Sequence, residues 1–158
     1  MIISRRRWIA QAVGGTLVVL TGQRAWGTAL RQVAGPTLTV YKSRTCGCCQ
    51  KWVEYIQAQG FATVVHDEEA MDTVKDTLGV PQGVRSCHTA HVANYLIEGH
   101  VPAQDIQRLL EERPKVLGLA VPGMPSSTPG MLEAGAKPEP YEVVSFQPDG
   151  MTRVYARH

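Results

Sequence analysis

The sequence has few cysteines, and it places none of them outside two short motifs. Four cysteines occur in 158 residues, three in the run Cys46-Gly47-Cys48-Cys49 and the fourth in the pair Cys87-His88. A thiolate is both a soft metal ligand and a strong nucleophile. Such crowding therefore predicts a metal site, a redox site or a disulfide knot.

The first 27 residues lack acidic side chains, and they also lack an apolar stretch long enough to span a membrane comfortably. Basic residues 5–7 precede an apolar run over 8–20, and residues 25–27 (Ala-Trp-Gly) offer small side chains at the spacing that a signal peptidase requires. This order predicts an export signal over residues 1–27 and a periplasmic protein. Residues 4–9 also resemble a twin-arginine signal, although a Sec signal begins with basic residues as well. An uncleaved anchor is the alternative.

Beyond this segment the chain lacks an excess of positive charge. Four of the 16 basic residues and none of the 14 acidic residues precede residue 28, which leaves 12 bases, 14 acids and a formal charge of −2. The basicity of the whole chain therefore belongs to the targeting segment. We expect neither nucleic acid as a partner nor, after removal of the signal, a membrane.

The remainder also lacks an internal repeat and any sign of a second domain. We expect a linker over residues 28–37 and one domain over residues 38–158, long enough to bury a core without disulfides. That size weakens a purely structural role for the cysteines, whereas export to an oxidising compartment strengthens it.

The order of the predicted elements is that of a thioredoxin-like α/β domain. The apolar face of the first helix consists of Trp52, Val53 and Ile56, and the C-x-x-C spacing of Cys46 and Cys49 falls at the start of that helix, where the positive helix end favours thiolate. A β-hairpin closes the chain, with Asp-Gly suited to its turn. The predicted strands are 38–41, 61–65, 92–97, 141–146 and 151–156; the predicted helices are 50–59, 68–78 and 102–113; and 118–130 is predicted to be a loop.

Disulfides alone are one interpretation of the sulfur cluster. Adjacent α-carbons lie about 3.8 Å apart, closer than the roughly 4.4–6.8 Å that a relaxed disulfide prefers. A Cys48–Cys49 bridge would therefore be strained. A Cys46–Cys49 bridge is feasible, and Cys87 could then pair with Cys48.

A thiol–disulfide oxidoreductase that uses Cys46 and Cys49 is the second interpretation. Its difficulty is Cys48, because a third thiol beside the active pair would compete for mixed disulfides.

Metal binding is the interpretation that uses every cysteine. Three thiolates from one loop and a fourth from Cys87 could surround one soft ion or a small cluster. Structural zinc sites usually draw two ligands from each of two knuckles, so zinc fits this three-plus-one arrangement less well. Thiolate and thioether ligands select Cu(I), which places copper ahead of zinc. Since thiols must lose protons to bind it, affinity should fall with pH.

Several other side chains are candidates for the same site. His88 is either a direct ligand or a hydrogen-bond donor to one. Met124 and Met131 lie in or beside the Gly/Pro loop, where a thioether could reach a soft cation, although packing of the loop explains them as well. His91 and His100 are interpreted as structural.

Five motifs in one order resemble the CopG-like family of exported bacterial copper-resistance proteins, also catalogued as domain of unknown function 411. They are Cys46-Gly47-Cys48-Cys49 followed by Trp52, Gly79-Val80-Pro81, Ser86-Cys87-His88-Thr89-Ala90, Glu98-Gly99-His100-Val101-Pro102 and Gly118-Leu119-Ala120-Val121-Pro122-Gly123-Met124-Pro125. The resemblance covers roughly residues 38–132 and leaves 133–158 unmatched.

This resemblance implies a thioredoxin-like fold that binds copper through Cys46, Cys48, Cys49 and Cys87. It also implies a role in periplasmic copper tolerance, with efflux components as partners and a change between Cu(I) and Cu(II). The sequence leaves open whether the protein turns over as an enzyme.

Overall fold

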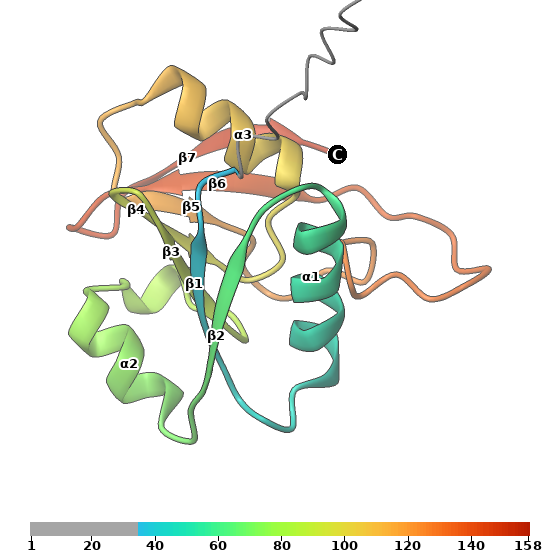
Figure 1. Cartoon of the computed structure of the whole chain (residues 1–158). Helices are drawn as coiled ribbons and strands as arrows, with labels where there is room; N and C mark the ends of the chain where they lie inside the picture. Colours follow the sequence, from blue (N-terminus) through green and yellow to red (C-terminus); the bar gives the residue numbers. More distant parts are fainter. Residues whose placement is uncertain (1–34) are drawn as a thin grey trace, which may run out of the picture. The chain divides into compact units, whose positions relative to one another are not determined.

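A computed structural model describes residues 35–158 (Figure 1). The predicted export signal and residues 28–34 of the predicted linker lie outside the described residues. Residues 35–37 belong to neither a helix nor a strand. No helix between residues 35 and 158 has the length and apolar character needed to cross a membrane.

The described chain forms one mixed α/β sheet structure. Seven strands pair in the order β2-β1-β3-β4-β5-β6-β7, with three α-helices and a short 3₁₀ helix connecting them. The strands are β1 Leu38–Lys42, β2 Thr63–Asp67, β3 Thr89–Val92, β4 Tyr95–Glu98, β5 Gly118–Ala120, β6 Glu142–Phe146 and β7 Thr152–Arg157. The helices are α1 Gly47–Ala58, α2 Met71–Leu78, η1 Gln82–Val84 and α3 Ala103–Glu112.

The two faces of the sheet carry separate apolar clusters, because neighbouring residues of a strand point to opposite faces. Ile97 of β4 packs in the larger cluster with the buried faces of α1 and α3, and its neighbour Leu96 packs in the smaller cluster with Val80 and Val84. The predicted apolar face of α1 is confirmed, since Trp52, Val53 and Ile56 are all buried.

The sequence prediction of one strand over 92–97 is wrong. The chain turns at Ala93 and Asn94, and Ala93 adopts a left-handed φ of 52°, so β3 and β4 form an antiparallel pair. Both strands are almost wholly buried, and Asn94 is the only turn-forming residue within 92–97, with no glycine or proline there to mark the turn.

The predicted loop over 118–130 begins instead with the short strand β5, parallel to β4. A Cβ atom on Gly118 would lie 1.9 Å from the carbonyl oxygen of Leu96, so only glycine permits this approach of the two strands. The predicted C-terminal hairpin is confirmed as the antiparallel pair β6–β7, which extends the sheet beyond β5.

Candidate metal centre

Three of the cysteines lie at the beginning of α1. Cys46 is the N-cap residue, while Cys48 and Cys49 belong to the first turn. A disulfide joins Cys46 and Cys49, with an Sγ–Sγ distance of 1.99 Å, and Cys48 and Cys87 are free thiols. The structure thus contains one of the two bridges of the disulfide interpretation, and it does not contain the Cys48–Cys87 bridge.

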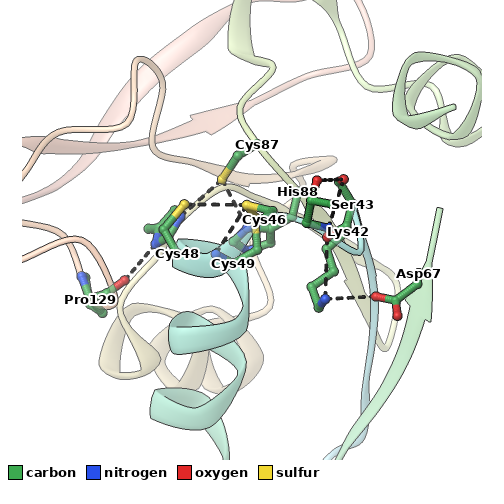
Figure 2. The surroundings of a disulfide bond; sticks show 11 residues. Lys42, Ser43, Cys46, Cys48, Cys49, Asp67, Cys87, His88 and Pro129 are labelled. Atoms are coloured by element: carbon green, nitrogen blue, oxygen red, sulfur yellow. Dashed lines mark hydrogen bonds and ion pairs between the residues drawn. A yellow bond between two sulfur atoms is a disulfide. The ribbon is translucent and has the colours of Figure 1, made fainter. Parts of the chain in front are cut away.

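The fourth cysteine reaches this cluster from the loop between η1 and β3. The Sγ atoms of Cys46, Cys48, Cys49 and Cys87 all lie within 4.8 Å of one another (Figure 2). The Cys46 and Cys48 sulfur atoms are 3.5 Å apart. Two segments separated by about forty residues of sequence therefore bring every sulfur atom of the cysteines to one place.

Burial raises the pKa of the Cys87 thiol to about 11, and the neighbouring Cys48 adds to the shift. Without a metal this thiol is protonated at neutral pH. A metal ion that binds Cys87 must therefore displace its proton.

His88 is the adjacent candidate, and its ring is completely buried. Its Nδ1 lies 3.3 Å from the sulfur of Cys87, and the ring packs on Trp52 with a centroid distance of 4.4 Å. Its Nε2 has no hydrogen-bond partner among residues 35–158. Burial holds the pKa of His88 well below its usual value, so the imidazole is neutral and able to coordinate a metal.

His100 is the site residue that sequence reasoning missed. The Nε2 atom of His100 lies 3.1 Å from the sulfur of Cys87, and the Nδ1 atom lies 2.7 Å from the carbonyl oxygen of Pro129. Burial also lowers its pKa. The only signal in the sequence was the motif that carries His100, because the contact crosses from the end of β4 to another loop. His91, by contrast, is exposed on β3.

The loop after β5 packs its backbone against the first turns of α1. A Cβ atom on Gly130 would lie 2.7 Å from the backbone nitrogen of Trp52 and 3.1 Å from the carbonyl oxygen of Cys48. Met131 follows directly and is half-buried, whereas Met124 lies earlier in the loop and is 45% exposed. Met131 therefore follows a residue that packs against the first turns of α1, which makes it the better placed of the two candidate methionines.

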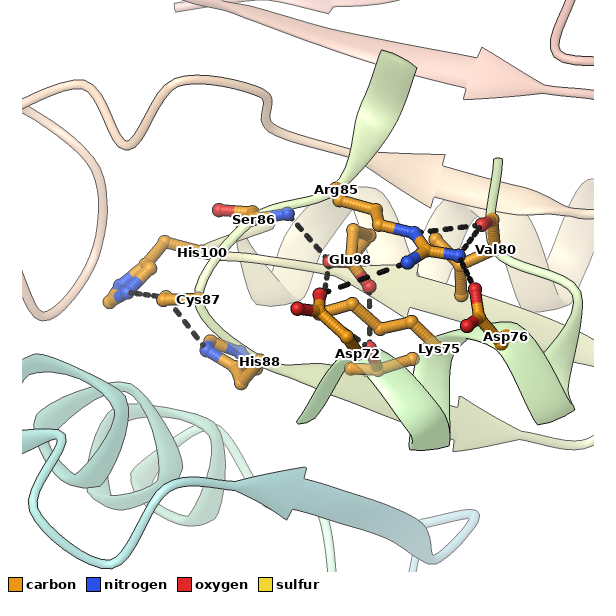
Figure 3. A network of polar contacts seen from close by, with 11 residues as sticks. Asp72, Lys75, Asp76, Val80, Arg85, Ser86, Cys87, His88, Glu98 and His100 are labelled. Atoms are coloured by element: carbon orange, nitrogen blue, oxygen red, sulfur yellow. Dashed lines mark hydrogen bonds and ion pairs between the residues drawn. The ribbon is translucent and has the colours of Figure 1, made fainter. Parts of the chain in front are cut away.

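A buried ion pair supports the loop that carries Cys87 (Figure 3). Glu98 is paired with Lys75, and both side chains are buried. The Glu98 carboxylate also accepts hydrogen bonds from the backbone nitrogen of Ser86 and the hydroxyl of Thr89, each at 2.6 Å. Burial raises the pKa of Glu98 and Lys75 opposes that rise. Since Ser86 and Thr89 flank the Cys87-His88 pair, this network fixes the backbone on both sides of it.

A second ion pair fixes the strand that leads into the cysteine motif. The buried Lys42 at the end of β1 donates to the carboxylate of Asp67 at 2.8 Å, and this hydrogen bond lowers the pKa of Asp67 (Figure 2).

The donor atoms fit a soft, thiophilic metal such as copper. Thiolate sulfur selects Cu(I), and imidazole nitrogen also suits copper. The buried Nε2 of His88 has no hydrogen-bond partner among the described residues, so one polar atom next to the cysteines is still free to bind something else. All four thiolates become available only when the Cys46–Cys49 disulfide is reduced.

Comparison with known proteins places the same region in a family. A family model described as "Protein of unknown function, DUF411" matches residues 84–131, which include Cys87. A solved structure described as "Copper resistance protein copG- Form 1" is 42% identical, with a TM-score of 0.71, and the match covers 78% of this chain and 98% of that chain. A second, described as "Copper resistance protein copG- Form 2", is 41% identical with a TM-score of 0.72 and the same coverage. None of the curated proteins matches the chain.

Proposed function

Because the chain belongs to the CopG-like family of copper-resistance proteins, we propose that it binds Cu(I) through the thiolates of Cys46, Cys48, Cys49 and Cys87. The observation that carries the proposal is the gathering of these four sulfur atoms within 4.8 Å of one another. The cellular role would be copper resistance, with copper as the cargo and periplasmic efflux components as its recipients.

Four thiolates in so small a volume would hold one Cu(I) ion or a small cluster with bridging sulfur atoms. Cu(I) tolerates low coordination numbers, so thiolates from one helix end and one loop suffice. His88, next to Cys87, and Met131, in the loop after β5, would add ligands to the four thiolates. Met124 would reach the site only if its exposed loop folded inward. A change of the bound ion between Cu(I) and Cu(II) would move one electron per ion.

The β1–α3 part of the chain supports a thioredoxin-like assignment. Its strands pair in the order β2-β1-β3-β4, with β1 parallel to β2 and antiparallel to β3. The helix α1 connects β1 to β2 and begins at the cysteine motif. In a thioredoxin-like fold this helix end is where exposed cysteines react.

Export would place this site where copper is handled outside the cytoplasm. The proposal assigns residues 1–27 to a removed signal, 28–37 to a linker and 38–158 to the copper-binding domain. Mass spectrometry of the protein recovered from periplasm should give an N-terminus near residue 28. Retention of residues 1–27 in a cytoplasmic pool would contradict export.

Anaerobic titration of the reduced chain with Cu(I), in competition with a Cu(I) chelator, tests the copper site. We expect tight uptake of at least one copper ion per chain and loss of copper in Cys48→Ser, because that change removes a soft ligand. The control is Thr45→Ser, an exposed residue just before the motif, which should bind as the parent does. Uptake should weaken as the pH falls, by about tenfold per pH unit for each proton released, since the Cys87 thiol with its raised pKa must ionise.

Unchanged copper binding in all four Cys→Ser variants would contradict the proposal.

The Cys46–Cys49 disulfide favours one second candidate, a thiol–disulfide oxidoreductase. Such an enzyme would reduce the disulfides of insulin without metal and would tolerate Cys48→Ser. A copper-binding protein should fail the first test and be damaged by the second change. Insulin reduction together with no Cu(I) uptake would therefore select the oxidoreductase.

A further inference from the structure

Two imidazole rings flank the sulfur of Cys87, one on each side (Figure 3). The sulfur lies 3.3 Å from Nδ1 of His88 and 3.1 Å from Nε2 of His100. Both rings are fully buried, and their centroids are 5.0 Å apart. The thiol can donate its one proton to one ring nitrogen and accept an N–H hydrogen bond from the other, so the tautomers of the two rings decide what each contact is.

The tautomer of His100 follows from its other contact. A carbonyl oxygen only accepts hydrogen bonds, so Nδ1 of His100, at 2.7 Å from the oxygen of Pro129, must carry the proton. Its Nε2 is then unprotonated and faces Cys87. A ring nitrogen that donates to a backbone carbonyl while the other nitrogen carries a free lone pair is the usual state of a metal-ligating histidine.

The distances also suit ligands of one ion. Sulfur and nitrogen atoms bound at about 2.3 and 2.0 Å to a single tetrahedral ion lie about 3.5 Å apart. The two sulfur–nitrogen distances here, 3.1 and 3.3 Å, are close to that value. Cys49, Cys87, His88 and His100 also form a group whose ligand atoms all lie within 4.8 Å of one another.

The disulfide divides the ligands into two sets. When Cys46 and Cys49 are joined, the four-thiolate set loses two of its members. The set of Cys87, His88 and His100 keeps all three. Thiolates favour Cu(I), whereas two imidazoles and one thiolate form a set that stabilises Cu(II) as well.

We propose that Cys87, His88 and His100 form a nitrogen-rich copper subsite that survives formation of the Cys46–Cys49 disulfide and holds Cu(II). This inference rests on the proposed copper function and adds to it an oxidised state that retains metal. Copper would then remain on the protein when Cys46 and Cys49 are oxidised to the disulfide, held by ligands outside that pair.

The sharpest probe is the oxidised full-length Cys48→Ser chain. This variant retains the Cys46–Cys49 disulfide and leaves Cys87 as the single free thiol, which has no partner within the chain to reduce Cu(II) by forming a disulfide. After addition of one equivalent of Cu(II) and desalting, we expect one copper ion per chain. Its electron paramagnetic resonance spectrum should show couplings to two nitrogen nuclei, together with a thiolate-to-copper charge-transfer band.

Substitutions in the Cys48→Ser background separate the subsite from adventitious binding. His100→Gln should weaken Cu(II) binding at least tenfold and remove one nitrogen coupling, and His88→Gln should do the same for the other ring. His91→Gln, which changes an exposed histidine on β3, should leave both affinity and spectrum unchanged. Thermal unfolding of each variant checks that the domain remains folded, and the parent spectrum tests the inference without any change to a histidine.

Copper that shows no nitrogen coupling, or equal affinity in the His100→Gln and His91→Gln variants, would overturn the subsite. The two proposals fail separately. If the reduced wild-type chain takes up Cu(I) but the oxidised Cys48→Ser chain does not hold Cu(II), only this inference fails. If Cu(II) binds with two nitrogen couplings while reduced wild type ignores Cu(I), the subsite is supported and the four-thiolate site is wrong.

Discussion

Replacing Lys75 with methionine should lower the free energy of unfolding by about 3 to 5 kcal/mol. The change leaves the Glu98 carboxylate buried with no cation beside it, although the hydrogen bonds from Ser86 and Thr89 remain. Equilibrium unfolding in denaturant, followed by the fluorescence of the buried Trp52, measures the loss.

The double variant Lys75→Met/Glu98→Gln should recover most of that stability, because a neutral amide can accept from Ser86 and donate to Thr89 without burying a charge. A matched surface control is Arg157→Met, which breaks an ion pair with Glu142 whose side chains are 74% and 48% exposed. An exposed pair contributes only about 0 to 1 kcal/mol. Equal losses in Lys75→Met and Arg157→Met would show that the buried pair has no special role.

The pH dependence of the stability loss in Lys75→Met tests whether the buried charge of Glu98 causes it. The pKa of Glu98 is already raised by burial, and loss of Lys75 removes the main influence that opposes the rise. A carboxyl whose folded pKa lies above its unfolded pKa stabilises the fold fully below the unfolded pKa, and that contribution is lost as the pH rises through the folded pKa. The deficit of Lys75→Met relative to wild type should therefore be larger at pH 7.5 than at pH 5.

Gly130→Ala should cost about 3 kcal/mol of stability and should also weaken copper uptake. Gly130 has a φ of 85°, and a Cβ atom there would lie 2.7 Å from the backbone nitrogen of Trp52. The left-handed conformation costs an alanine about 1 to 2 kcal/mol, and overpacking against backbone adds about 1 to 3 kcal/mol. Because the Cβ would also lie 3.1 Å from the carbonyl oxygen of Cys48, relief of the clash must move the loop or the first turn of α1.

Gly135→Ala is the matched control for this prediction. Gly135 has the same φ of 85°, and a Cβ atom there would meet nothing within 4 Å. Its substitution should cost only the conformational part and leave copper uptake unchanged. The difference between the two variants, measured by denaturant unfolding and Cu(I) competition, isolates the contact between the loop and the cysteine motif. Equal behaviour of the two variants would show that the loop does not support the site.

The sequence by itself determined the features that depend on neighbours along the chain. The spacing of Trp52, Val53 and Ile56 predicted the buried face of α1, and the Asp-Gly turn predicted the hairpin of β6 and β7. The placement of three cysteines at a helix start followed from the break between a strand pattern and a helical pattern. The CopG-like family was also identifiable, because its motifs are short and keep one order in the chain.

Only the tertiary structure decided which distant side chains meet. Cys87 and His100 are 13 residues apart, and Lys75 and Glu98 are 23 residues apart, yet both pairs are in contact. Local periodicity carries no information about such pairs, so His100 was interpreted as structural and the Lys75–Glu98 pair was not foreseen. The turn between β3 and β4 and the strand β5 were also missed. The turn between β3 and β4 is local, but no glycine or proline marks it, whereas β5 forms by pairing with β4 and β6 and depends on the absence of a side chain at Gly118.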